Sequence, residues 1–211
     1  MNFTVHSFPE KTGFAAEERS SYAHEIFADL KNLSLDGPGV SRETYGAGET
    51  AAMTYCAELA RKEGLSSWYD EAANLVIELT GQEKAAPFII CGSHLDSVPQ
   101  GGNFDGAAGV VAGLIALVRM KREGRVPPIS IRVMALRGEE SAWFGQCYLG
   151  SRALFGQLTK TDIERPHRTS GKTLKSYMQD VSVNIEKIVS GEPLINASSI
   201  AAYLELHIEQ G

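Results

Sequence analysis

Three short clusters of imidazole and carboxylate side chains each follow an apolar run of the sequence, and a further carboxylate lies in a glycine-rich loop. These residues are His94 and Asp96 in SHLD, Asp105 in GGNFDG, Glu139 and Glu140 in RGEES, and His207 in ELHIEQG. Imidazole nitrogens and carboxylate oxygens are the usual ligands of zinc and of neighbouring divalent ions. Because a charged group beside an apolar core is costly unless it is paired, we expect these side chains to share a metal site.

The spacing within the clusters indicates separate tasks. A metal-bound histidine generally donates its other ring hydrogen to a carboxylate, and the pattern His94-x-Asp96 places one within reach. Asp105 could bridge two ions that lie about 3.5–4 Å apart. Glu139 and Glu140 are adjacent, and successive side chains of an extended segment point in opposite directions. One of these two glutamates can therefore bind a metal while the other faces the attacking water.

Apolar periodicity predicts the elements that must position these clusters. Helical spacing occurs over residues 15–31, 49–62 and 105–123, and shorter helical pieces are expected between residues 147 and 180. Strands are expected in NLVIELTG, PFIICGSH, ISIRVMAL and SIAAYLELHIEQG. Strands that alternate with helices favour an α/β sandwich with helices on both faces of the sheet. In such sheets ligands bind beyond the carboxyl ends of the strands, which is where the three clusters lie.

Composition excludes several classes of partner. The net charge is −6, without a basic patch, so nucleic acid is not expected to bind. Three dispersed cysteines, Cys56, Cys91 and Cys147, favour a reducing compartment over a disulfide framework. The first residues lack a secretory signal, and the apolar run over residues 107–118 is shorter than the roughly 20 residues that span a bilayer. We therefore expect a cytoplasmic protein that does not bind membranes.

Three longer motifs resemble one known family. The segments GSHLDSVPQGGNFDGAAGV, RGEESAWFGQCYLGSRAL and YLELHIEQG together are similar to the amidase branch of the metallopeptidase M20 clan. That branch contains N-carbamoyl-L-amino-acid hydrolases, allantoate amidohydrolases and β-ureidopropionases. The resemblance implies a three-layer α/β/α sandwich with a mixed, mostly parallel sheet, as in the catalytic domains of zinc peptidases.

The resemblance also implies a role for each residue of the clusters. His94, Asp105 and His207 would bind the first of two divalent ions, and Asp105 would also reach the second. The remaining roles would fall to Glu140 as a ligand of the second ion, Glu139 as the general base, Asp96 as the partner that orients His94, and Gln210 as a substrate-binding residue. Zinc is the expected metal, although manganese, cobalt and nickel also suit such ligands.

Members of this family are longer than the present chain. The resemblance therefore implies that residues 1–211 are the N-terminal part of a catalytic domain, and that a lid domain, which makes a homodimer, and the last histidine ligand lie outside it. Without those parts, we expect an unpaired sheet edge, exposed apolar surface and little or no activity.

The expected reaction is metal-dependent hydrolysis of a non-peptide C–N bond in a linear amide or ureido compound, such as an N-carbamoyl-L-amino acid or allantoate. Two alternatives remain open. One is a dipeptidase or aminoacylase of the M20 type, which uses the same metal pair. The other is a non-catalytic, metal-binding fragment. Each cluster by itself also has a structural explanation, since HxD and GEE segments are common in solvated loops.

Overall fold

A mixed five-stranded sheet forms the centre of the structure, a computed structural model that describes residues 15–209. In spatial order, its strands are β3 (Ser66–Tyr69), β4 (Leu75–Leu79), β6 (Ile131–Leu136), β5 (Phe88–His94) and β7 (Ile200–Leu204). β5 is parallel to both β6 and β7, whereas β4 is antiparallel to both of its neighbours. Four of the five strands therefore run in one direction, as the mixed, mostly parallel prediction requires. A separate hairpin joins β1 (Leu35–Asp36) and β2 (Gly39–Val40).

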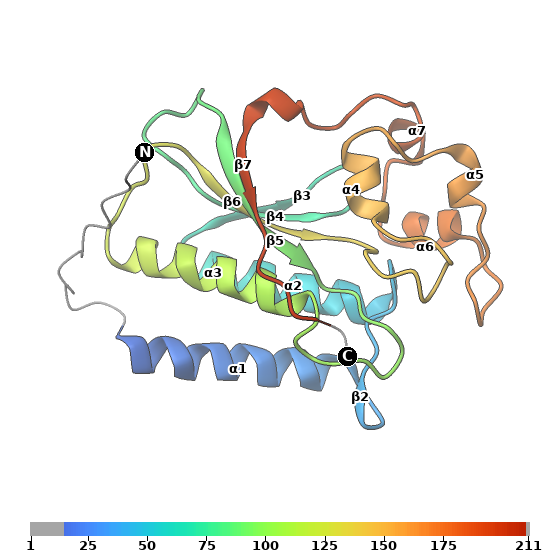
Figure 1. Cartoon of the computed structure of the whole chain (residues 1–211), viewed down its shortest axis with the longest axis horizontal. Helices are drawn as coiled ribbons and strands as arrows, with labels where there is room; N and C mark the ends of the chain where they lie inside the picture. Colours follow the sequence, from blue (N-terminus) through green and yellow to red (C-terminus); the bar gives the residue numbers. More distant parts are fainter. Residues whose placement is uncertain (1–14, 210–211) are drawn as a thin grey trace.

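Three long helices lie on one side of this sheet, and the first of them packs on the other two rather than on the strands (Figure 1). They are α1 (Ala16–Ser34), α2 (Ala47–Lys62) and α3 (Ala107–Arg122). In α3 the buried residues Val110, Leu114 and Leu117 follow helical spacing, so one apolar stripe faces the strands. These residues belong to the largest apolar core cluster, which also contains Leu75 and Val133 of the sheet. Burial of that stripe fixes α3, and with it the loop that carries Asp105.

The opposite face of the sheet is only partly covered. The short helices α4 (Leu149–Leu154), α5 (Lys160–Ile163), α6 (Leu174–Asp180) and α7 (Ile185–Ile188) gather at one end of the molecule (Figure 1). They pack mainly on one another and on Trp143 and Phe144, while Leu154 joins the apolar cluster on the sheet itself. The predicted three layers are thus present, with a second helical layer that is incomplete. None of the helices in the described part of the chain combines the length and apolar character of a bilayer span.

Most predicted elements match the structure. The segment SIAAYLELHIEQG was expected to contain a strand followed by the His207 cluster, and β7 indeed ends at Leu204, so that residues 205–209 leave the sheet. The strand β3 was not predicted. It is a four-residue edge strand whose side chains are mostly exposed, so it lacks the apolar alternation that marks a half-buried strand.

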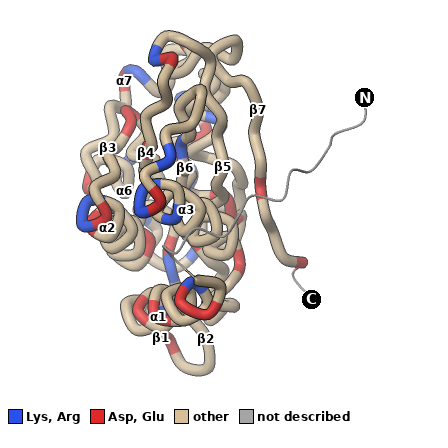
Figure 2. The backbone as a smooth tube through the Cα atoms, turned by 90° about the vertical axis from the view of Figure 1, so that its left-hand side faces the viewer, with Lys and Arg blue, Asp and Glu red and all other residues tan. Residues whose placement is uncertain are grey.

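The outer edge of β7 has no strand partner within residues 15–209, since β7 pairs only with β5 (Figure 2). Large apolar side chains along and after this strand are exposed: Tyr203 (46%), Leu204 (61%), Leu206 (55%) and Ile208 (40%). The unpaired edge and the exposed apolar surface expected from the sequence are therefore both observed. Such an edge is a template for pairing with another chain.

We predict that this edge drives self-association, and that Leu204→Lys weakens it. A lysine on an edge strand opposes further strand pairing because its charge would have to be desolvated. Sedimentation velocity over a concentration series measures the protein concentration at which half of the chains are associated. In Leu204→Lys this concentration should rise by about tenfold or more, which corresponds to roughly 1.4 kcal/mol. The control is Leu33→Lys, which changes an exposed leucine of α1 away from the edge. An equal shift in both variants would contradict the prediction.

Candidate metal centre

The three sequence clusters meet at one end of the sheet. His94 is the last residue of β5, Glu139 and Glu140 follow the end of β6, and His207 follows β7. Because these three strands are parallel, their carboxyl ends lie side by side. Two groups of side chains that could hold a metal result: His94 with Asp105 and His207, and His94 with Glu139 and Glu140. Within each group the ligand atoms lie within 4.8 Å of one another.

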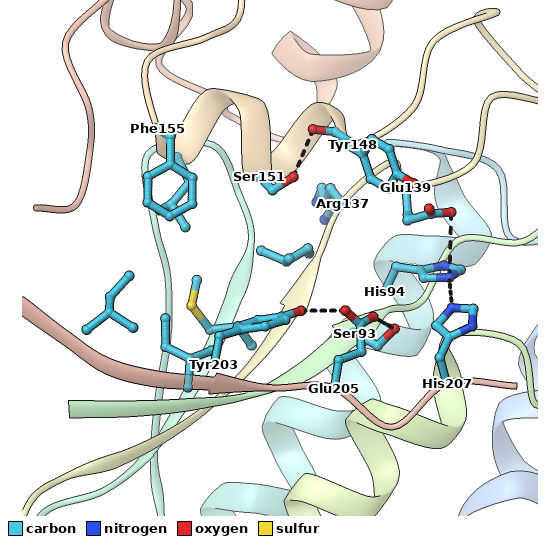
Figure 3. Close-up of a pocket in the computed structure, with 15 residues that line it drawn as sticks. Ser93, His94, Arg137, Glu139, Tyr148, Ser151, Phe155, Tyr203, Glu205 and His207 are labelled. Carbon is cyan, nitrogen blue, oxygen red and sulfur yellow. Dashed lines mark hydrogen bonds and ion pairs between the residues drawn. The ribbon is translucent and has the colours of Figure 1, made fainter. Parts of the chain in front are cut away.

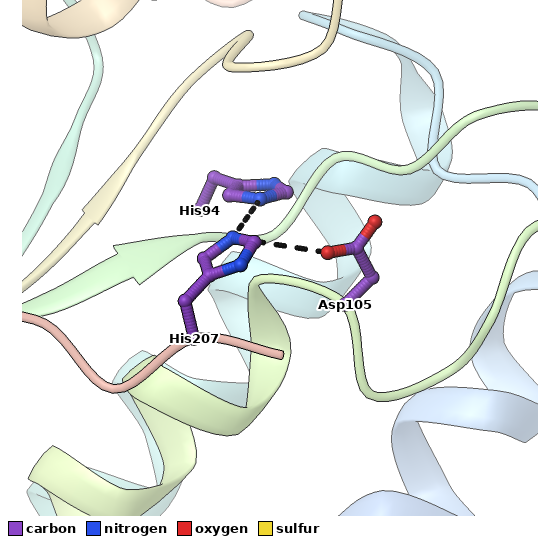
Figure 4. A group of neighbouring side chains, drawn as sticks. All are labelled: His94, Asp105 and His207. Carbon is purple, nitrogen blue, oxygen red and sulfur yellow. Dashed lines mark hydrogen bonds and ion pairs between the residues drawn. The ribbon is translucent and has the colours of Figure 1, made fainter. Parts of the chain in front are cut away.

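The donor atoms of the first group lie close enough together to share one metal ion (Figure 4). The Nε2 atoms of His94 and His207 are 3.2 Å apart, and His207 Nε2 lies 3.8 Å from Asp105 Oδ1. Two ligands of a tetrahedral zinc ion, each bound at about 2.0–2.1 Å, lie roughly 3.3 Å apart. The side chains of His94 and Asp105 are buried, whereas that of His207 is 39% exposed. The donor atoms and their spacing therefore fit one divalent ion.

Asp96 contacts the Nδ1 side of the His94 ring. His94 Nδ1 lies 3.3 Å from Asp96 Oδ1 and 3.0 Å from the Asp96 carbonyl oxygen. Since both partners are acceptors, Nδ1 carries a hydrogen, and Nε2 faces the other ligands. Burial lowers the pKa of His94, but the carboxylates of Asp96 and Glu139 outweigh it and raise the pKa to about 9. In the metal-free chain this histidine is therefore positively charged at neutral pH.

Glu139 and Glu140 do not face opposite sides. Both offer a carboxylate oxygen to the group that contains His94, and Glu139 Oε2 lies 3.7 Å from His94 Nε2. The expectation of opposite directions assumed an extended segment, but β6 ends at Leu136 and Gly138 adopts a φ of +62°. Burial raises the pKa of the Glu139 carboxyl, opposed by the charge of His94. Within residues 15–209, no single candidate group contains both Asp105 and Glu140, which were expected to share the second ion.

Gly106 makes room for the His94 ring. It lies at the start of α3 with a φ of +62°, and a Cβ atom placed on it would come within 2.5 Å of three ring atoms of His94. Only glycine fits both the left-handed backbone and the contact. The glycine-rich loop thus serves to pack backbone against an imidazole.

A cavity of about 760 Å³ opens beside the two groups (Figure 3). His94, Glu139 and His207 line one end, and apolar residues of the sheet such as Met134 and Leu136 line much of the remainder. The cavity wall contains residues that the sequence analysis did not select: Ser93, Tyr148, Tyr203 and Glu205. Ser93 Oγ and Tyr203 Oη donate hydrogen bonds to the two carboxylate oxygens of Glu205, at 2.5 and 2.9 Å. The predicted substrate residue Gln210 lies outside the described residues.

We predict that Gly106→Ala weakens zinc binding by the 211-residue chain by about tenfold or more, because the added methyl group displaces the His94 ring. Isothermal titration with zinc measures the change. The control is Gly102→Ala in the same loop, where nothing lies within 4 Å of the added Cβ. Unchanged affinity in Gly106→Ala would contradict the assigned role of His94.

We also predict that zinc binding strengthens as pH rises. A metal binds the neutral imidazole, so zinc must displace the proton that His94 holds below its pKa of about 9. Displacement of one proton makes the apparent affinity rise by about tenfold per pH unit below that value. Titrations at several pH values, in buffers of different ionisation enthalpy, count the protons released. An affinity independent of pH would contradict the prediction.

Comparisons with known proteins relate the chain to a group of amidases. The chain is 35% identical to an N-carbamoyl-L-amino acid amidohydrolase of Geobacillus stearothermophilus over 82% of its own length and 42% of the relative's. It is 32% identical to an allantoate amidohydrolase of Bacillus subtilis over 84% and 42% of the two lengths. A crystal structure of a hydantoinase/carbamoylase family amidase from Burkholderia ambifaria superimposes with a TM-score of 0.78 and 28% identity, over 90% of this chain and 45% of the other.

The chain therefore spans less than half the length of these relatives. They are amidases of the kinds that the three sequence motifs indicated, so the resemblance is confirmed. The family model that matches is described as peptidase family M28, rather than M20, and covers residues 74–206. Because that match includes more than half of the sequence and two of the three clusters in full, the chain belongs to peptidase family M28.

Proposed function

We propose that the whole protein hydrolyses a non-peptide C–N bond in a linear amide or ureido compound, such as an N-carbamoyl-L-amino acid or allantoate. The observation that carries this proposal is the meeting of His94, Asp105 and His207 around one point, with Glu139 beside them. The relatives supply the substrate class, since they are named for the hydrolysis of N-carbamoyl amino acids and allantoate.

The proposed cofactors are two divalent ions, zinc by preference, with manganese, cobalt or nickel also compatible with the mixed nitrogen and oxygen donors. His94, Asp105 and His207 would hold the first ion, and Glu140 would contribute to the second. When bound, such ions polarise a carbonyl group and lower the pKa of water. Asp96 holds the Nδ1 side of the His94 ring, which would leave Nε2 to bind the first ion.

Glu139 is the proposed general base. Its carboxylate accepts a proton from the attacking water and later gives that proton to the leaving nitrogen. Burial raises the pKa of Glu139, which helps it to keep the proton between the two steps. An N-carbamoyl amino acid would then yield the amino acid and carbamate, which decomposes to ammonia and carbon dioxide.

The domain organisation is part of the proposal. Residues 1–211 form the N-terminal part of the catalytic domain, while the lid domain, the homodimer contacts and the last ligand of the second ion lie elsewhere. The chain's coverage of its relatives supports this division, as do the open edge of β7 and the bare apolar floor of the cavity. The free cysteines support a cytoplasmic location.

We predict that Glu139→Gln in a protein extended to the length of the relatives lowers kcat by about 10²–10⁴-fold, the usual contribution of a general base. Zinc at the first site should stay unchanged, because His94, Asp105 and His207 remain. The assay measures ammonia release from N-carbamoyl amino acids and from allantoate, with dipeptides as the competing substrates. The control is Glu83→Gln, an exposed glutamate in a loop.

Three outcomes would overturn parts of the proposal. Full activity in Glu139→Gln would exclude this residue as the base. Cleavage of dipeptides without release of ammonia would favour the dipeptidase or aminoacylase alternative. A full rate from the 211-residue chain alone would contradict the proposed division of the catalytic domain.

A further inference from the structure

The turn that carries Glu139 and Glu140 is held by side chains rather than by regular secondary structure. Four consecutive backbone N–H groups each donate to a buried side-chain oxygen: Arg137 to Asn74 Oδ1 (2.9 Å), Gly138 to Glu49 Oε1 (3.0 Å), Glu139 to Asp96 Oδ1 (3.0 Å) and Glu140 to Asp96 Oδ2 (3.1 Å). All three acceptor residues are fully buried. They come from the β3–β4 turn, from α2 and from the end of β5, which are far apart in the sequence.

The carbonyl groups of the same turn are also held. Those of residues 137, 138 and 139 accept hydrogen bonds from the backbone N–H groups of Gly150, Leu149 and Tyr148, at 2.7, 2.8 and 3.1 Å. Backbone atoms on both sides of the turn are thus fixed by partners. As a result, the two glutamate side chains project from a backbone that has little freedom to move.

Among these three acceptor residues, Glu49 has a large desolvation cost because its carboxylate is fully buried. Its carboxylate is buried in the first turn of α2, where it also accepts the N–H of Tyr45 (2.6 Å) and pairs with Arg137 Nη1 (2.8 Å). Arg137 is itself buried and donates through Nε to the carbonyl oxygen of Ala73 (2.8 Å). Replacing a buried ion pair with apolar side chains is often neutral or stabilising, so fold stability alone does not explain this pair. Every polar partner of Glu49 is a donor, which suits a carboxylate.

The contacts of Glu49 lie nearer to one of the two candidate metal groups. Asp96 holds the turn but also contacts His94, which belongs to both groups. Within residues 15–209 the hydrogen bonds of the Glu49 carboxylate go to Arg137 and Gly138, which immediately precede Glu139, and to Tyr45, which follows the Asp96 partner Thr44. The effect of Glu49 on the group with Glu139 and Glu140 can therefore be measured against its effect on the group with Asp105 and His207.

We propose that Glu49 is a positioning residue for the proposed hydrolysis: by holding Gly138 and Arg137, it sets Glu139 and Glu140 against His94. The inference rests on the proposed function and deepens it. A merely structural Glu49 would affect both metal groups alike, through loss of the fold. A positioning Glu49 affects the group that contains Glu139 and Glu140 and spares the group that contains Asp105 and His207.

The experiment is zinc titration of the full 211-residue chain with Glu49→Gln introduced into two backgrounds. His207→Ala leaves only the group with Glu139 and Glu140, and Glu140→Gln leaves the group with Asp105 and His207. We expect Glu49→Gln to weaken zinc binding by about tenfold or more in the first background, as for other residues that orient ligands, and by less than about twofold in the second. The matched control is Glu58→Gln, an exposed glutamate on the same helix.

The outcomes are distinct. Equal loss in both backgrounds, or loss in neither, overturns the positioning role. Absence of zinc binding by the unsubstituted chain instead overturns the metal site proposed for His94, Asp105 and His207, which is the observation that carries the proposed function. In that case, hydrogen exchange of the Gly138, Glu139 and Glu140 amides still shows whether Glu49 holds the turn, since protection should fall in Glu49→Gln only if it does. If Glu49→Gln does not fold, Glu49→Asp replaces it, because aspartate keeps the charge but is one methylene shorter.

Discussion

The buried carboxylate of Asp96 is the interaction on which the rest of the site depends. It accepts hydrogen bonds from Thr44 Oγ1 at 2.7 Å and from the backbone N–H groups of Glu139 and Glu140. It also lies against the His94 ring. Four donors around one carboxylate satisfy the charge without solvent. A single side chain thereby couples the end of β5 to the segment after β6. Loss of its charge would release a ligand and the proposed base together.

The site also concentrates negative charge at the end of the sheet. Asp96, Asp105, Glu139 and Glu140 gather around two imidazoles, and this excess is why the pKa of His94 rises despite its burial. Like charges at such distances repel unless a cation lies between them. In the metal-free chain the proton on His94 partly fills that role. A divalent ion held by these residues would supply more positive charge and would let both imidazoles act as neutral ligands.

Sequence patterns were sufficient for the parts of the fold that depend on local periodicity. The apolar runs that became α3 and β5 predicted both elements, and strand ends predicted where the clusters meet. The directions of the Glu139 and Glu140 side chains could not be predicted from periodicity. They depend on the turn at Gly138 and on hydrogen bonds to Asn74, Glu49 and Asp96, which are distant in the sequence. Glu49 resembles the ordinary acidic residue of a helix N-terminus, so no local signal marks its contact with Gly138. Ser93, Tyr148 and Glu205 likewise carry no local signal in the sequence. They were identified only because the fold places them on the wall of the cavity.

The three proposed ligands of the first ion differ in how they are supported. His94 and Asp105 are buried and set by β5 and by the packing of α3, whereas His207 lies on an exposed segment beyond an edge strand. Two donors are therefore set by the core of the fold, while the third lies on a segment held by the bonds of Ser93 and Tyr203 to Glu205 and by the packing of Leu206 against Gly109. Capture of an ion would begin at the rigid pair and finish when the outer imidazole closes over it. The lifetime of the bound ion would then depend on how often residues 205–209 move away from the rest of the site.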